Sequence, residues 1–251
     1  MSSQVLRLPQ TARYYATNGL ADDLHADAVA AASSTYPVES FDIIVVAFPP
    51  IYPAALSDSK FTFSGLGSVG GSKTWINGSL NSRVVAHELG HNYGLFHANR
   101  WQVSDGNPIS NAGESLEYGD DFDTMGQGGL DAHFSMFGKN RLGLLPDSAV
   151  VDVTQSGTYR IYRFDHQAAS LGQTQALRVF RDGLSWYWVG LRRALNSHPA
   201  INAGAYVIWA PSAEGKTQLL DLNTPGIDTN DAALALNQTL SDSEFGLTLR
   251  P

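Results

Sequence analysis

Eleven residues, from His87 to His97, constrain the fold more than any other part of the sequence. His87 and His91 are four positions apart, so on a helix their imidazoles stand on one face and can share one tetrahedral metal ion. Gly94 accepts the left-handed backbone conformation that ends helices, which predicts a helix end and a turn at this point. The turn brings His97 back as a third ligand. Three protein ligands leave a fourth position open, which is typical of catalytic rather than structural zinc sites.

Glu88 lies one step round the same helix from His87. From there its carboxylate does not easily join the two imidazoles as a ligand, but it can reach a water that the metal activates, and we expect it to be a general base. A bare HExxH pattern also occurs by chance on polar helix faces that hold no metal. The added glycine and third histidine, at the required spacings, favour the metal site.

A methionine-bearing turn follows downstream, in Asp123-Thr124-Met125-Gly126. The chain resembles the metzincin metallopeptidases here, because that clan pairs the extended zinc motif with such a turn beneath the metal. Met125 is the candidate Met-turn residue, and its alternative is a core methionine that fills a gap. Several metzincins place a tyrosine two residues after this methionine. That position is Gln127 here, so no tyrosine role is carried over, and Gln127 is either a hydrogen-bond donor or an ordinary turn residue.

Within the clan, the chain is most similar to the gametolysin-like peptidases. The similarity extends over about residues 35 to 250 and is carried by the zinc motif, by residues 65–75 and 131–144, and more weakly by the C-terminal part. The glycine-rich residues 65–72 fit an exposed edge strand or a bulge that another backbone can approach closely. The resemblance implies a secreted zinc endopeptidase whose edge strand binds extended substrate, and the substrate-binding candidates are Gly67, Ser68, Val69, Gly70 and Gln127.

The sequence predicts an α+β chain of two domains. Residues 20–34 and 83–93 have helical character, and residues 41–48 form an apolar run expected to be a strand buried on both faces. The second half contains short segments of strand character separated by turns, namely 151–153, 158–162, 176–180, 186–191, 205–209, 218–222 and 247–250. We therefore expect a metzincin-like catalytic domain, with a twisted sheet and the zinc helix, over residues 1–146. A β-sandwich-like C-terminal domain is expected over residues 147–251.

Composition limits the cofactors and partners. The chain has no cysteine, which excludes disulfides, cysteine nucleophiles and thiolate zinc sites, and its net charge of −8 disfavours nucleic acids and anionic lipids. No apolar run is long enough for a membrane span. We expect one catalytic Zn²⁺. Calcium is an open alternative at the acidic residues of two loops, where a solvated acidic turn is the favoured interpretation: Asp120, Asp121 and Asp123, and Asp105 with Asn107.

Three hypotheses about function follow. The first is hydrolysis of peptide bonds in extracellular proteins by a zinc-activated water, with Glu88 as the base. The second is a binding module that keeps the zinc-binding fold with weak or no turnover, motivated by Gln127 at the position of the missing tyrosine and by the β-rich C-terminal part. The third is zinc-dependent hydrolysis of a non-peptide amide or ester. The start, Met1 to Gln4, shows no signal peptide, so the chain is either cytoplasmic or one whose signal has been removed. Cleavage preference and oligomeric state do not follow from the sequence.

Overall fold

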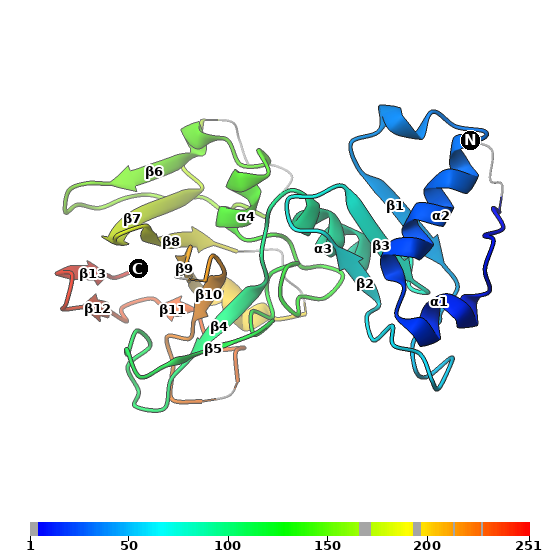
Figure 1. The fold of residues 1–251 in the computed structure, drawn as a ribbon. Helices are drawn as coiled ribbons and strands as arrows, with labels where there is room; N and C mark the ends of the chain where they lie inside the picture. Colours follow the sequence, from blue (N-terminus) through cyan, green and yellow to red (C-terminus); the bar gives the residue numbers. More distant parts are fainter. Residues whose placement is uncertain (1–4, 166–171, 193–196, 213, 227) are drawn as a thin grey trace. The chain divides into compact units, whose positions relative to one another are not determined.

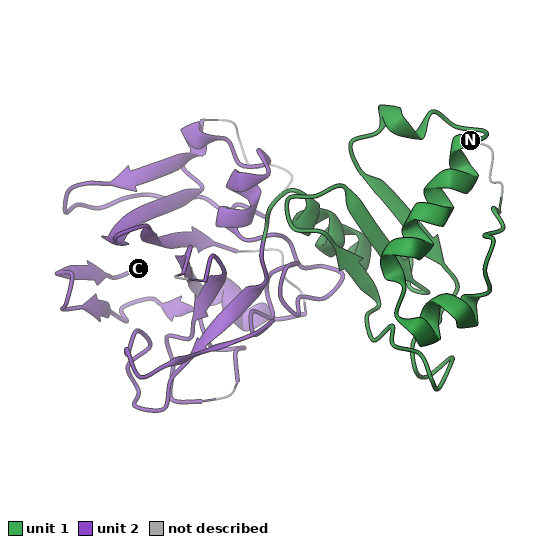
Figure 2. Ribbon diagram, in the orientation of Figure 1, with its two compact units in different colours: residues 1–95 green, residues 96–251 purple. Residues whose placement is uncertain are grey.

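The computed structural model describes residues 5–165, 172–192, 197–212, 214–226 and 228–251. The chain divides into two compact units, residues 1–95 and 96–251, which Figure 2 distinguishes by colour. Both units combine helices and strands, so the predicted α+β class is confirmed. The predicted domains, 1–146 and 147–251, differ from this division, because residues 98–116 supply two strands to the main sheet of the second unit. The domain boundary and the β-sandwich stay predictions.

The first unit is a three-stranded sheet with helices, in the strand order β1-β3-β2. Its elements are α1 Ala12–Asn18, α2 Ala21–Ser33, the short 3-10 helix η1 Val38–Ser40, β1 Ile44–Phe48, β2 Gly65–Gly67, β3 Lys73–Asn77 and α3 Ser82–Asn92 (Figure 1). β1 runs parallel to β3, and β2 runs antiparallel to it as an edge strand, as predicted. Both helices expected in this part are present as α2 and α3.

The core of the first unit gathers apolar side chains of α1, α2 and β3 with those of the segment after β1. Its buried members are Tyr15, Ala16, Leu24, Ile51, Phe61 and Trp75. The expectation that residues 41–48 are buried on both faces is wrong, because burial alternates along β1 and Val45 is 38% exposed. β1 is the other edge strand, and by the two-residue period of a strand its more exposed residues lie on one face of the sheet.

The second unit is built on one large mixed sheet, in the order β5-β4-β10-β9-β8-β7-β6, with β11 also paired to β9. Its elements are β4 Ala98–Gln102, β5 Glu114–Leu116, α4 Met136–Arg141, η2 Asp147–Ala149, β6 Val150–Val153, β7 Ala176–Asp182, β8 Ser185–Leu191, η3 Pro199–Ala203, β9 Gly204–Ala210, β10 Thr217–Leu220, β11 Leu234–Ala235, β12 Leu240–Asp242 and β13 Leu247–Leu249. The strand predicted at residues 158–162 is absent, although the Tyr162 N–H donates to the Thr174 carbonyl at 2.8 Å.

Alternate residues of β8 and β9 enter two different cores, as the two-residue period of a strand requires. Trp188 and Ile208 belong to a cluster that includes Met136 of α4. Val189 and Val207 belong to a second cluster, against which apolar side chains of β12 and β13 pack. The sheet is therefore covered on both faces, which explains its apolar strands.

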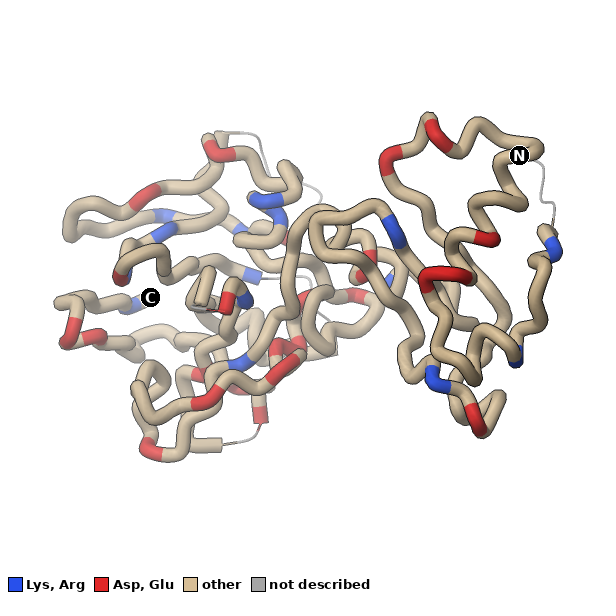
Figure 3. Tube along the Cα trace, viewed as in Figure 1, with Lys and Arg blue, Asp and Glu red and all other residues tan. Residues whose placement is uncertain are grey.

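Charge is distributed over the whole chain. Acidic positions occur in both units, in keeping with the net charge of −8 (Figure 3). Within the described ranges, no helix has both the length and the apolar character that crossing a bilayer demands.

Candidate metal centre

Helix α3 carries the first half of the histidine motif, and its two ends are fixed by local hydrogen bonds. At its start, the Asn81 side chain caps the helix by accepting from the Val84 N–H at 3.0 Å. At its end, Gly94 has a φ of 86°, the Gly94 N–H donates to the His91 carbonyl and the Leu95 N–H donates to the Gly90 carbonyl. This pair of bonds is the Schellman motif. The helix therefore ends at the glycine, as the sequence predicts.

The three histidines come together within one continuous stretch of chain. His87 and His91 are each 7% exposed, and their ring centroids lie 4.8 Å apart. The candidate ligand atoms of His87, His91 and His97 all lie within 4.8 Å of one another. Among the residues that the structure describes, they form the one group of three histidine or carboxylate side chains able to hold a metal ion.

Hydrogen bonds to two of the imidazoles show that the donor set fits a metal. His91 Nδ1 lies 2.8 Å from the Leu95 carbonyl oxygen, and His97 Nδ1 lies 2.8 Å from Glu117 Oε1. A carbonyl and a carboxylate only accept, so both Nδ1 atoms carry the hydrogen and leave the Nε2 lone pair for a ligand bond. Metal-ligating histidines commonly have such partners, which fix the tautomer and the ring orientation.

Glu88 is 7% exposed and lies where the edge strand β2 approaches helix α3 closely. A Cβ atom at Gly67 would be 2.4 Å from the Glu88 carbonyl oxygen, so only glycine fits there without a shift of the backbone. Burial raises the pKa of Glu88 to about 7, and a hydrogen bond from the Gly67 N–H partly offsets this rise. A carboxyl group with this pKa suits proton transfer near neutrality.

The glycine-rich segment after β2 uses its backbone donors inside the chain. The Ser68 N–H donates to the Lys73 carbonyl at 3.0 Å, and the Gly70 N–H donates to the His91 carbonyl at 2.8 Å. The side chains of Val69 and of Leu66 in β2 are both exposed, at 45% and 40%. The segment therefore presents two apolar side chains to solvent, while several of its N–H groups hold β3 and α3.

The turn around Met125 is organised by Asp123. The Asp123 carboxylate accepts from the backbone N–H groups of Met125 and Ser135, each at 2.8 Å. Met125 itself is 2% exposed. Its carbonyl oxygen accepts from the Ala98 N–H at 2.9 Å, and Ala98 directly follows His97. The turn thus fixes the backbone beside the third histidine. Gln127 lies two residues further on, with an exposed side chain.

The interpretation of residues 120–123 as a solvated acidic turn is wrong for Asp120 and Asp123, which are 0% and 2% exposed. Asp120 accepts from the Phe122 N–H at 2.9 Å and from the Tyr206 hydroxyl. Burial and the neighbouring Asp123 raise the pKa of Asp120 to about 7. The local sequence did not reveal that Asp120 is buried, because its partner Tyr206 comes from β9, far along the chain.

Two residues next to His97 were not singled out from the sequence. Glu117 accepts the hydrogen bond from His97, and the ring centroid of Tyr118 lies 3.8 Å from that of the imidazole. Hydrogen bonding to His97 is the main cause that lowers the pKa of Glu117. No spacing rule predicts these contacts, since they depend on how β4 and β5 pair.

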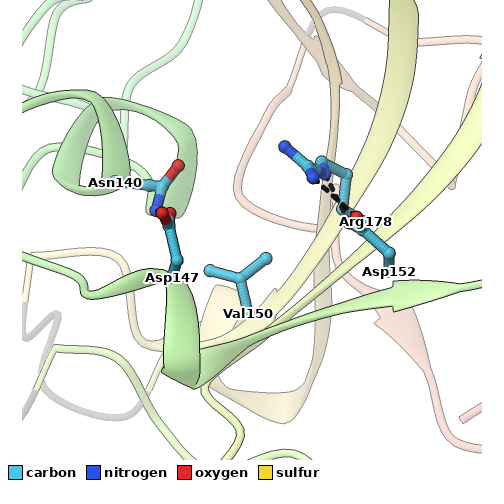
Figure 4. Close-up of a pocket in the computed structure, with 5 residues that line it drawn as sticks. All are labelled: Asn140, Asp147, Val150, Asp152 and Arg178. Carbon is cyan, nitrogen blue, oxygen red and sulfur yellow. Dashed lines mark hydrogen bonds and ion pairs between the residues drawn. The ribbon is translucent and has the colours of Figure 1, made fainter.

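A separate pocket of about 250 Å³ lies in the second unit (Figure 4). It is lined by side chains of α4, η2, β6 and β7, namely Asn140, Asp147, Val150, Asp152 and Arg178. The polar groups are already paired, because Arg178 donates two hydrogen bonds to Asp152 and Asn140 donates one to Asp147. No part of the histidine motif lines this pocket.

A family model matches the chain. The sequence model described as gametolysin peptidase M11 matches residues 23–186, a range that includes α3, the three histidines and the turn around Met125. No curated protein and no solved structure matches the chain.

Proposed function

The chain belongs to the gametolysin peptidase family M11, a family of zinc metalloproteases, and we propose that it is a secreted endopeptidase that cleaves extracellular proteins. The observation that carries this proposal is the convergence of three imidazoles within 4.8 Å beside the buried carboxyl of Glu88. The family match supports peptide hydrolysis over other hydrolytic reactions, because it covers the whole motif.

We assign the metal ligands to His87, His91 and His97, through the Nε2 atoms in the case of His91 and His97. A bound zinc ion would supply a Lewis acid that lowers the pKa of water and favours negative charge on the carbonyl oxygen. The carbonyl of Leu95 and the carboxylate of Glu117 keep two of the rings in the required tautomer.

Glu88 is the general base in this mechanism. Its carboxylate takes a proton from the attacking water and passes it to the nitrogen of the departing amine. Its burial and its contact with Gly67 hold it in place, and a pKa near neutrality lets it both accept and return the proton. Met125 supports the site indirectly, through its backbone bond to Ala98.

Substrate binding is assigned to the edge strand β2 and the segment that follows it. Because the N–H groups of Ser68 and Gly70 are used within the chain, the exposed side chains of Leu66 and Val69 are the better candidates for contacts with a peptide. Gly67 contributes by letting β2 approach Glu88. Gln127, exposed after the Met-turn, stays a further candidate.

The decisive experiment compares Glu88→Gln with the wild-type protein. We expect turnover of casein or gelatin to fall by about 10²- to 10⁴-fold, the usual contribution of a positioned general base, while zinc binding persists. Zinc content is measured by elemental analysis and turnover with and without a chelator. Glu114→Gln is the matched control, since it makes the same change at an exposed position on β5.

Three outcomes are informative. Chelator-sensitive cleavage that the Glu88→Gln variant loses supports the proposal. Stoichiometric zinc without cleavage of any member of a peptide library would instead favour the binding module. Full activity in the Glu88→Gln variant would show that the base is misassigned.

A further inference from the structure

The third histidine is held differently from the first two, by a pair of residues that lie beyond the end of β5. Glu117 and Tyr118 follow β5 directly, and β5 is antiparallel to β4, which begins one residue after His97. The strand pairing therefore carries both residues to the histidine. The Asp120 N–H then donates to the Ala98 carbonyl, so the segment after β5 stays hydrogen-bonded to the start of β4.

Two contacts act on the imidazole of His97 from different directions. Glu117 accepts from Nδ1 at 2.8 Å, and the Tyr118 ring lies 3.8 Å away between centroids, at an interplanar angle of 36°. The first contact selects the tautomer and the second limits the tilt of the ring. His97 needs both, because its side chain is 19% exposed, whereas His87 and His91 are buried on a helix.

The backbone of Tyr118 adds an independent observation. Its φ is 60°, a left-handed conformation that bulky residues rarely adopt and that persists only where the surroundings demand it. The Tyr118 N–H donates to the side chain of Asn99 at 3.2 Å, and Asn99 is 1% exposed on β4. A glycine would relieve the backbone at this position, so the presence of tyrosine points to a use for its ring.

We infer that Glu117 and Tyr118 are positioning residues that orient the imidazole of His97 for metal binding. The inference rests on the proposed function, because it assumes that His97 is a metal ligand. An ordinary surface ion pair is the alternative, since the Glu117 side chain is 55% exposed and exposed pairs contribute little to stability. The two roles differ in what they change: orientation of a ligand alters metal affinity, while a surface pair alters neither affinity nor tautomer.

The test measures zinc affinity by competition with a chromophoric chelator. Glu117→Ala is expected to weaken zinc binding about 10- to 100-fold, the usual effect of removing such a partner. Glu117→Gln is expected to weaken it less, because its amide oxygen still accepts from Nδ1. Glu114→Ala and Glu114→Gln are matched controls on β5 and should bind zinc as the wild type does.

Tyrosine variants separate the ring from the backbone. Tyr118→Phe keeps the ring and should keep the affinity. Tyr118→Gly is expected to lose about three- to tenfold in affinity, the range for loss of one ring contact, without losing thermal stability in the metal-free state. An unfolded variant would be recognised by circular dichroism, and the remaining variants still decide the question.

Nitrogen NMR of the histidine rings gives a readout that a purely structural role would not move. In metal-free wild-type protein, we expect the neutral imidazole of His97 to carry its hydrogen on Nδ1, and in Glu117→Ala we expect a mixture of tautomers. If the wild type binds zinc while Glu117→Ala matches Glu114→Ala in affinity and tautomer, this inference is overturned and the proposed function stands. If the wild type binds no zinc, both are overturned.

Discussion

Glu88 in the first unit and Asp123 in the second are both buried carboxyl groups, but the chain holds them in different ways. Among the residues that the structure describes, Glu88 receives one backbone hydrogen bond, from Gly67. Asp123 receives backbone bonds on both oxygens, from Met125 and Ser135. A carboxyl group with a backbone donor on each oxygen is suited to fixing the fold, whereas one with more acceptor capacity left can take part in chemistry. Under the proposed function, burial alone therefore does not distinguish the general base Glu88 from Asp123, and the number of hydrogen-bond donors to the carboxyl group is the better guide.

The largest effects are expected at two glycines that lie against backbone carbonyl oxygens, one beside Glu88 and one in the turn around Met125. A Cβ at Gly126 would be 2.0 Å from the Asp120 carbonyl oxygen, and one at Gly67 would be 2.4 Å from that of Glu88. Because backbone atoms must shift in both cases, we expect Gly126→Ala and Gly67→Ala each to lower the free energy of unfolding by about 3 kcal/mol. Gly157→Ala, where the nearest atom is 3.6 Å away, is the control for urea unfolding. Equal stability of all three variants would contradict these close approaches.

Replacing each carboxyl group by its amide tests the comparison of Asp123 with Glu88 directly. Asp123→Asn keeps one good acceptor but turns its amide hydrogens toward a backbone N–H, so we expect a loss of about 1–3 kcal/mol in the free energy of unfolding. Glu88→Gln in the metal-free protein should be neutral or slightly stabilising, because it removes the cost of burying an ionised carboxylate. Thermal and urea unfolding of both variants measure the difference. A destabilisation of similar size in the two would show that the number of donors does not separate their roles.

A smaller effect is expected at the start of helix α3. The Asn81 side chain accepts from the Val84 N–H, and its removal in Asn81→Ala should cost about 1 kcal/mol, as for other N-caps. Asn81→Asp keeps the acceptor and should keep the stability. Zinc affinity of Asn81→Ala is measured as well. A loss of binding free energy larger than the loss in free energy of unfolding would show that the cap also fixes the geometry of His87 and His91.

The two halves of the site were also predictable to different degrees. His87, Glu88, His91 and Gly94 lie within one helix and its end, so a period of 3.6 residues and the conformational freedom of glycine suffice to place them. Glu117 reaches His97 through strand pairing, which no local pattern reveals. Asp120 looked like part of a polar turn because its partner Tyr206 is on a distant strand. Local sequence patterns thus predict the residues on the helix. The residues that contact them or His97 from other strands depend on tertiary structure and are not predicted.

The last expected effect is a change of slope with pH. Burial and the charge of Asp123 raise the pKa of Asp120 from 3.8 to about 7, although Tyr206 and Arg192 oppose the rise. The folded protein therefore binds this proton more tightly than the unfolded chain. Its contribution to stability is complete below about pH 4 and declines as the pH rises toward 7.

Asp120→Asn has no such proton to lose, and its amide can still accept from the Phe122 N–H and donate to the Tyr206 oxygen. Between pH 4 and 7, its free energy of unfolding should fall less steeply than that of the wild type. Asp121→Asn controls for the loss of one negative charge at the same turn. Parallel curves for the wild type and Asp120→Asn would mean that Asp120 is ionised throughout. Asp123 would then have a charged neighbour, and the raised pKa of Asp120 would have to be given up.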